Sequence, residues 1–231
     1  MRVYGLLILA VGGGLLAAVA LVARWIHRRW RTPYALLTVG VITYTGALAA
    51  QFAILRAFGG PLLDILAIRA VVFGLLAGFS EEIARLLGYQ YLARGAVTRP
   101  QALMIGLGHG AVETIYTGLV GAGLGLSLLG YGAQRPDDLS ALASGALAEA
   151  LGGALPLMMH MALSWLALQV FLRGQIGWLF VAVALHAATE SMIVLLGPDA
   201  GWAVAGWRAL VALLSLGVIG AVRPPRERSH A

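Results

Sequence analysis

The chain contains no cysteine and no lysine among its 231 residues, and only 11% of its residues are charged. Without cysteine there is no disulfide, no thiolate metal site and no cysteine nucleophile. A soluble domain carries about 25% charged residues, so the low charge excludes that class, as do the 60% hydrophobic content and the mean hydropathy of +0.87. Any chemistry must therefore come from His, Glu, Asp, Ser, Tyr or Arg.

Apolar stretches of about 20 residues, the length that crosses a bilayer as a helix, recur along the whole chain. They predict an all-α fold, a bundle of about seven transmembrane helices that forms one integral membrane domain over residues 1–231. Two of the stretches are longer than a bilayer needs, which predicts tilting or extension into the interface. The predicted spans are 3–23, 34–55, 61–92, 101–130, 139–172, 175–196 and 201–222.

All 16 basic residues are arginines, and the net charge is +6. They occur in short clusters between the apolar stretches, which is typical of topology signals and not of a nucleic-acid surface. The cluster after the first span predicts a retained anchor helix and marks the cytoplasmic side. A multi-pass cell-membrane protein follows, with its N-terminus outside and its C-terminus in the cytoplasm. This topology places ten arginines inside, namely Arg24, Arg28, Arg29, Arg31, Arg94, Arg99, Arg173, Arg223, Arg226 and Arg228, against Arg2, Arg56 and Arg135 outside.

Ionisable groups inside a span cost roughly 2.5 to 3.5 kcal/mol on insertion scales and therefore indicate function. Here they are concentrated in the third to sixth spans, about residues 61–196, which we predict to form the catalytic core. The first, second and seventh spans are expected to be scaffold. The polar residues of the core are Ser80, Glu81, Glu82, Arg85, His109, Glu113, Glu149, His160, Ser164, His186, Thr189 and Glu190.

Spacing and depth predict one common site for most of these residues. Residues four apart share a helix face, and a rise of 1.5 Å per residue places the main groups at about 12 to 21 Å from the cytoplasmic ends. We expect the site to open more easily to the cytoplasm. Glu81 is assigned to the pocket and Glu82 to an ion pair with Arg85, whereas Glu149 is expected to lie outside the site as a packing carboxylate. Pro156 is expected to kink its helix.

Three chemistries are compatible with such a site. A buried carboxylate can act as general base on water, while one histidine relays the proton and another donates a hydrogen bond to the oxyanion. A metal site, with zinc bound by His109, His160, His186 and Glu113, is the second possibility, although no HExxH motif occurs. A proton-coupled transporter with a Glu/His relay is the third, but matching broken helices of the inverted-repeat kind are absent from the sequence.

The ordered set of motifs is recognisable. It resembles the YhfC-like family of membrane peptidases, related to the CAAX prenyl protease and bacteriocin-processing superfamily of glutamic-type intramembrane proteases. The similarity extends over the third to sixth spans. The motifs are Glu81-Glu82-x-x-Arg85, Gly106-Leu-Gly-His109-Gly-Ala-Val-Glu113, His160-Met-Ala-Leu-Ser164 and His186-Ala-Ala-Thr-Glu190.

The resemblance implies a peptidase without a cofactor in which Glu81 and His109 activate water and His186 contacts the oxyanion. Its substrate would be a membrane-associated or lipidated peptide or protein. The sequence departs from the superfamily pattern where Arg85 is one residue closer to the glutamates, Ile105 replaces phenylalanine and Glu190 replaces Asn or Asp. An ionised Glu190 would repel an oxyanion, so it is expected either to be neutral or to orient His186. Supporting roles are assigned to Glu82, Arg85, Glu113, His160 and Glu190.

Overall fold

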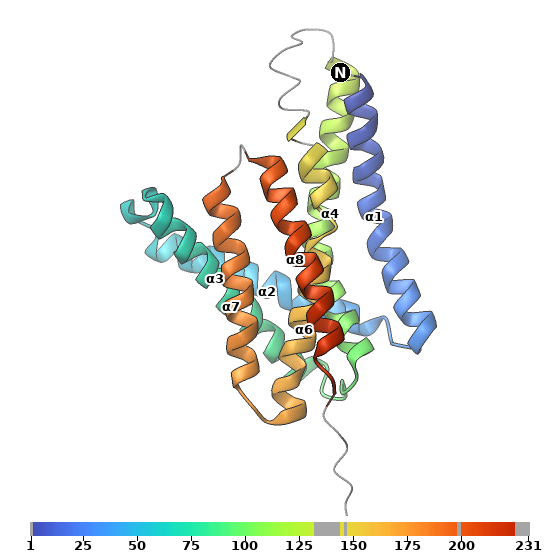
Figure 1. The fold of residues 1–231 in the computed structure, drawn as a ribbon, viewed down its shortest axis with the longest axis vertical. Coiled ribbons are helices and arrows are strands. Elements are labelled where there is room, and N and C mark those ends of the chain that lie inside the picture. The colour runs from blue at the N-terminus through green and yellow to red at the C-terminus, as the bar shows by residue number, and fades with distance from the viewer. Residues whose placement is uncertain (1, 132–143, 146, 198–199, 225–231) are drawn as a thin grey trace, which may run out of the picture.

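The structure is a computed structural model, which describes residues 2–131, 144–145, 147–197 and 200–224. This part of the chain is helical and contains no strand (Figure 1). The predicted all-α membrane fold is therefore confirmed. Its long helices are α1 (Arg2–Trp30), α2 (Ala35–Phe58), α3 (Leu66–Leu87), α4 (Arg99–Tyr131), α6 (Pro156–Arg173), α7 (Gly177–Leu196) and α8 (Gly201–Ala221).

Among the described residues, six helices are long and apolar enough to cross a membrane. The long helix outside this group is α3, which has 22 residues and spans about 33 Å at 1.5 Å per residue. It is long enough for a bilayer, but it carries Arg69 and Arg85 as well as the adjacent Glu81 and Glu82. Of these charges, Glu81, Glu82 and Arg85 are buried, so this half of α3 is shielded from lipid by its neighbours.

The third and fifth predicted spans are each divided. Residues 61–92 consist of a short 3₁₀ turn (Pro61–Asp64), then α3, and then a π-helical turn (Gly88–Leu92). In the fifth, the helix is broken by turns at residues 153–155, and α6 begins at Pro156. Proline is tolerated in the first turn because its missing N–H has no partner there, so the expected kink is a break. The part of this span at residues 139–143 and 146 lies outside the described residues.

The long helices form three sets. Helices α1 and α4 run side by side, and α6, α7 and α8 form a second, roughly parallel set. Helices α2 and α3 cross the molecule obliquely (Figure 1). Close approach of α3 to α7 depends on Gly78, where an added Cβ would lie 2.8 Å from the carbonyl oxygen of Val183. This approach brings the charged half of α3 into the interior.

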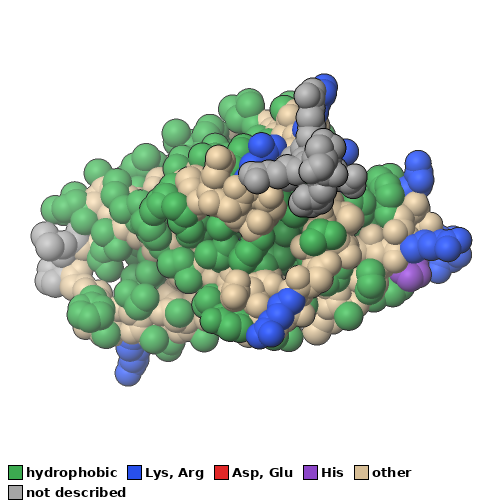
Figure 2. Space-filling model, turned by 90° about the horizontal axis from the view of Figure 1, so that it is seen from below, with side chains coloured by type: hydrophobic (Ala, Val, Ile, Leu, Met, Phe, Trp, Pro, Cys, Tyr) green, Lys and Arg blue, Asp and Glu red, His purple; other side chains and the backbone are tan. Residues whose placement is uncertain are grey.

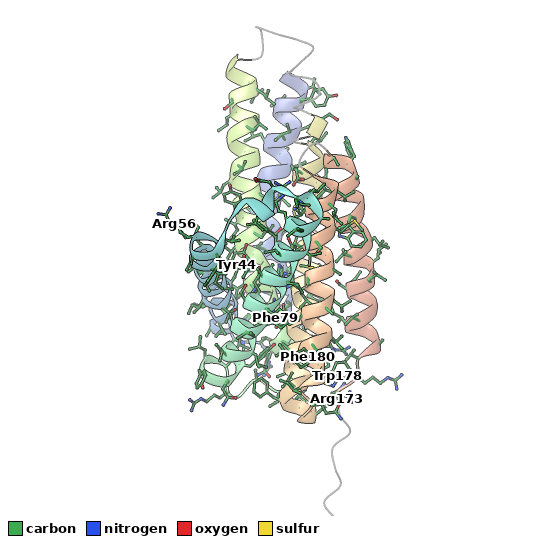
Figure 3. All side chains as sticks on the ribbon, turned by 90° about the vertical axis from the view of Figure 1, so that its left-hand side faces the viewer. Tyr44, Arg56, Phe79, Arg173, Trp178 and Phe180 are labelled. Atoms are coloured by element: carbon green, nitrogen blue, oxygen red, sulfur yellow. The ribbon has the colours of Figure 1, made fainter. Side chains whose placement is uncertain are left out.

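The arginine-rich segments gather at one end of the molecule, the lower end in Figure 1. There Arg99 donates to the carbonyl oxygen of Ile219 (2.8 Å), and Arg173 donates to that of Arg223 (2.7 Å). Seen from below, arginine side chains are spread among hydrophobic ones and no acidic side chain is visible (Figure 2). In contrast, Arg56 projects outward from the other end of α2 (Figure 3). The grouping agrees with the predicted bias of arginines to one side.

Candidate active site

Three histidines from three different helices meet in the interior. His109 of α4, His160 of α6 and His186 of α7 are all at most 1% exposed. The ring centroids of His109 and His160 are 4.9 Å apart, and those of His160 and His186 are 5.4 Å apart. The structure thus brings together the histidines that depth and spacing placed in one layer.

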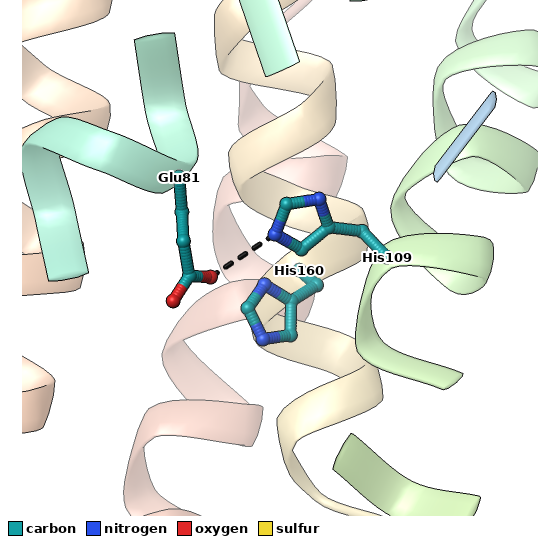
Figure 4. Close-up of side chains that lie close together, drawn as sticks. All are labelled: Glu81, His109 and His160. Carbon is teal, nitrogen blue, oxygen red and sulfur yellow. Dashed lines mark hydrogen bonds and ion pairs between the residues drawn. The ribbon is translucent and has the colours of Figure 1, made fainter. Parts of the chain in front are cut away.

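Glu81 lies at the centre of this cluster. Its Oε2 is 3.0 Å from Nε2 of His109 (Figure 4) and 3.6 Å from Nε2 of His186. Its other oxygen, Oε1, accepts a hydrogen bond of 3.1 Å from the amide of Gln51 on α2. Glu81 is therefore held from three helices, and its placement in the pocket agrees with the sequence assignment.

Glu82 occupies a separate, fully buried position. Arg85 donates to both of its oxygens, at 3.0 and 3.1 Å, and Nδ1 of His186 lies 2.9 Å from its Oε1. The predicted Glu82–Arg85 ion pair is confirmed. Glu190, by contrast, forms no hydrogen bond to His186 within the described residues, and Glu82 orients this histidine instead. Of the two alternatives expected for Glu190, a neutral carboxyl group stays a prediction.

Glycines on α4 determine how closely α6 approaches the cluster. An added Cβ on Gly106 would clash with the carbonyl oxygen of His160, and one on Gly110 would lie 2.9 Å from its Cδ2. Both glycines flank His109 in sequence. The glycine-rich motif around this histidine is thus a helix-packing device that presses the His160 ring against α4.

A cavity of about 430 Å³ adjoins the cluster, and Glu81, His160 and His186 form part of its wall. The other lining residues lie on the same side of the cluster, towards the arginine-poor end of each helix (Figure 1). On the opposite side Arg85, Tyr89 and Ser164 are at most 3% exposed and close the interior. The cavity therefore lies away from the arginine-rich end, which the sequence assigned to the cytoplasm, contrary to the expected direction of opening. The outward lining includes Gln51, Phe73, Tyr116, Glu149, Val194 and Arg208.

The serines of the core take no part in the cavity. The Ser164 hydroxyl is 2.7 Å from the hydroxyl of Tyr89, on the closed side. Ser80 donates to the carbonyl oxygen of Leu76 and accepts from Gln51. Neither forms a hydrogen bond to a histidine in the described part of the chain, so neither has a histidine base beside it.

Comparison with known proteins gives one match. The model of the YhfC intramembrane metalloprotease family matches residues 14–135, more than half of the chain. The chain belongs to the YhfC family. No curated protein and no solved structure matches it. The match includes the paired glutamates on α3 and His109 on α4, and it ends before α6, whereas the resemblance was expected to extend to residue 196.

The family description names a metalloprotease, and the cluster offers donors of the right kind. Glu81, His109 and His160 present possible ligand atoms that all lie within 4.8 Å of one another. The predicted metal set combined His109 and His160 with His186 and Glu113, whereas the group within this distance has Glu81 in place of Glu113 and does not include His186. Two ligands of a tetrahedral zinc with bonds of about 2.0 Å are roughly 3.3 Å apart, and the distances from Glu81 Oε2 to His109 and His186 bracket this value. The expectation of a site without a cofactor is not supported, and the residues of the site are compatible with zinc.

The hydrogen bond of His109 adds a second argument for a cation. The Thr43 hydroxyl donates to the carbonyl oxygen of Gly40 (2.9 Å), so at 3.0 Å it accepts from Nδ1 of His109. A neutral His109 therefore carries its proton on Nδ1 and turns an Nε2 lone pair towards the oxygen of Glu81. Two acceptors 3.0 Å apart need a positive charge between them, which a proton or a metal ion supplies.

Several site residues were missed by the sequence analysis. Arg208 of α8 lines the cavity and contacts Glu149 (2.8 Å) and Glu113 (3.8 Å). Glu149 therefore belongs to the cavity wall, contrary to the expectation that it lies outside the site. Thr43 and Gln51 come from α2, which, like α8, was expected to be scaffold. Arg208 carried a detectable signal, since it is a charge within a predicted span, whereas isolated Thr and Gln residues carry none.

Proposed function

We propose that this YhfC family protein is a metal-dependent peptidase that hydrolyses a peptide bond within or beside the bilayer. The observation that carries the proposal is the buried Glu81–His109 pair, 3.0 Å apart at the base of a cavity inside a membrane bundle. Glu81, His109 and one further histidine would hold the metal, and zinc in such a site lowers the pKa of bound water and polarises a carbonyl group.

The protein's own groups account for the proton transfers. With Glu81 and His109 as ligands, another carboxylate must act as base. We assign this role to Glu113, because its Oε2 is 3.5 Å from Nε2 of His160 and its side chain is 27% exposed in the cavity. The water oxygen bonds to the carbonyl carbon, Glu113 accepts the water proton and returns it to the nitrogen, and the C–N bond breaks. This is general acid–base catalysis by a single carboxylate.

The substrate we infer is a membrane-associated or lipidated peptide or protein. The helices present large apolar side chains on their outer surfaces, among them Phe52, Val71 and Leu213, which are 68%, 54% and 67% exposed. Such a surface is compatible with a lipid environment. This surface supports a substrate segment that itself resides in, or is anchored to, the bilayer.

The test is cleavage of a membrane-peptide library by the purified protein, with metal analysis and with a chelator. We expect bound zinc, cleavage that the chelator abolishes, and an inactive Glu81→Ala variant with wild-type helicity. Chelator-insensitive cleavage that still requires Glu81 would replace the metal mechanism with the glutamic one, in which Glu81 is the base. Full activity of Glu81→Ala would overturn both. Uptake into proteoliposomes without proteolysis would favour the transporter.

A further inference from the structure

The three histidines differ in what their Nδ1 atoms contact. Nδ1 of His109 donates to Thr43, as argued above, and Nδ1 of His186 faces the carboxylate of Glu82 at 2.9 Å. Glu82 is ion-paired with Arg85 and accepts, so His186 donates. In the neutral form of either ring, the Nδ1–H leaves an Nε2 lone pair directed at Glu81. A histidine whose second nitrogen donates to a carboxylate or hydroxyl is arranged as a metal ligand.

His160 has the opposite arrangement. Its Nδ1 is 3.2 Å from Nη2 of Arg85, and its carbonyl oxygen accepts from Nη1 of the same guanidinium at 3.1 Å. Arginine has donors and no acceptor, so Nδ1 of His160 must accept. A neutral imidazole that accepts at Nδ1 carries its proton on Nε2.

The packing of the ring supports this orientation. The Cδ2 edge of His160 lies against Gly110, so a flipped ring would place a nitrogen on this apolar contact and remove the partner of Arg85. Arg85 is itself fixed, because it is 0% exposed and binds both oxygens of Glu82. The tautomer of His160 is thus determined by contacts on the closed side of the site.

Nε2 of His160 is buried and has no hydrogen-bond partner among the described residues. It belongs to the cavity wall, and the nearest charged atom is Oε2 of Glu113, 3.5 Å away. A protonated Nε2 cannot bind a metal, because its lone pair is used by the proton. It can donate a hydrogen bond to a group that enters the cavity.

We propose that His160, although its ligand atom lies within 4.8 Å of those of Glu81 and His109, donates from Nε2 to the carbonyl oxygen of the scissile peptide bond and is not a metal ligand, so that Glu81, His109 and His186 form the ligand set. The inference rests on the peptidase function proposed above. When water adds to the carbonyl carbon, the carbonyl electron pair moves onto oxygen, and a donor already in place stabilises that charge. Arg85 is the positioning residue, since it holds the proton of His160 on the side facing the cavity.

The experiment compares zinc content and kinetics of His160→Leu, His160→Gln and His186→Gln. We expect both His160 variants to retain wild-type zinc, while His186→Gln binds zinc at least about 10-fold more weakly. His160→Leu should lose about 10²- to 10³-fold in kcat with KM unchanged. His160→Gln, whose amide can donate from near the Nε2 position, should recover part of this loss. Loss of zinc in His160→Gln equal to that in His186→Gln would overturn the proposal.

A measurement that does not depend on catalysis can test the position of the His160 proton separately from the proposed peptidase function. ¹⁵N NMR of histidine-labelled protein, with His160→Gln to assign the signal, should show His160 protonated at Nε2 and bare at Nδ1. The wild-type protein suffices for this measurement even if His160→Leu fails to fold. If the tautomer is as expected and no peptide is cleaved, the peptidase function fails while the position of the proton stands. A proton on Nδ1 overturns the proposal whatever the activity.

Discussion

The two sides of the histidine cluster differ in how completely their polar groups are paired. On the closed side, the guanidinium of Arg85 is shared between Glu82 and His160, and Tyr89 pairs with Ser164. On the open side, Oε2 of Glu81 is shared between the Nε2 atoms of His109 and His186, and Nε2 of His160 has no hydrogen-bond partner within the described residues. Both sides contain buried charge, so burial alone does not identify the reactive groups. Incomplete pairing does.

Replacing Arg85 should have the largest effect. Arg85→Met leaves the carboxylate of Glu82 buried without its partner, and breaking a buried pair in this way costs about 3 to 5 kcal/mol. Thermal or denaturant unfolding in detergent micelles measures the loss. The matched control is the double variant Glu82→Gln/Arg85→Met, which removes both charges and should recover a large part of the stability. Equal instability of the two would show that the ion pair is not what the closed side requires.

Replacing Glu81 should lower activity strongly and stability little, the reverse of what is expected for Arg85. Glu81→Gln is expected to lower kcat by about 10²- to 10⁴-fold, because the central carboxylate of the cluster is lost. Its unfolding free energy should change by less than about 1 kcal/mol, since the amide can still bond to Gln51. If Glu81→Gln were as unstable as Arg85→Met, the closed and open sides would not differ in their contribution to stability.

Thr43 tests the hydrogen bond that orients His109. Thr43→Val removes the acceptor of Nδ1 at nearly constant volume and should weaken zinc binding by about 10- to 100-fold. Thr43→Ser keeps the hydroxyl and is the control. Binding isotherms of the two variants, measured on the metal-free protein, give the comparison, and equal affinity would show that Thr43 does not act through His109.

The direction of the opening can be tested by thiol labelling, because the natural chain has no cysteine. Val194→Cys, in the cavity wall, should react with an impermeant reagent from the side opposite to the one that labels Arg94→Cys. Ser164→Cys should be protected from both sides, since position 164 is 0% exposed. Labelling of positions 94 and 194 from the same side would contradict the opening described here.

The helices and the layer of polar groups could be predicted because both depend on local rules. Bilayer thickness fixes span length, and the cost of a buried charge limits ionisable residues to sites where neighbours compensate. Those rules placed Glu81, His109, His160 and His186 together. The partners from α2 and the direction of the opening could not be predicted, because they depend on how Gly78 and the other glycines let oblique helices approach.

The assignment of roles within the site failed for a related reason. Spacing along one helix suggested that Glu190 orients His186, but the carboxylate that does so comes from α3, across a helix contact that sequence periodicity does not encode. Arg208 was passed over because α8 has no acidic residue or histidine. Its contact with Glu113 and Glu149 exists only in the packed bundle.

The closed side of the site also affects whether water and protons can cross the membrane through the protein. A cavity that admits water to a buried carboxylate inside a transmembrane bundle forms half of a path for protons across the membrane, and each charge that crosses 100 mV releases about 2.3 kcal/mol. The layer of Glu82, Arg85, Tyr89 and Ser164 is at most 3% exposed and has its hydrogen bonds directed inward. Water that reaches Glu81 therefore stops there. The protein can carry out hydrolysis inside the membrane and still leave the membrane an insulator.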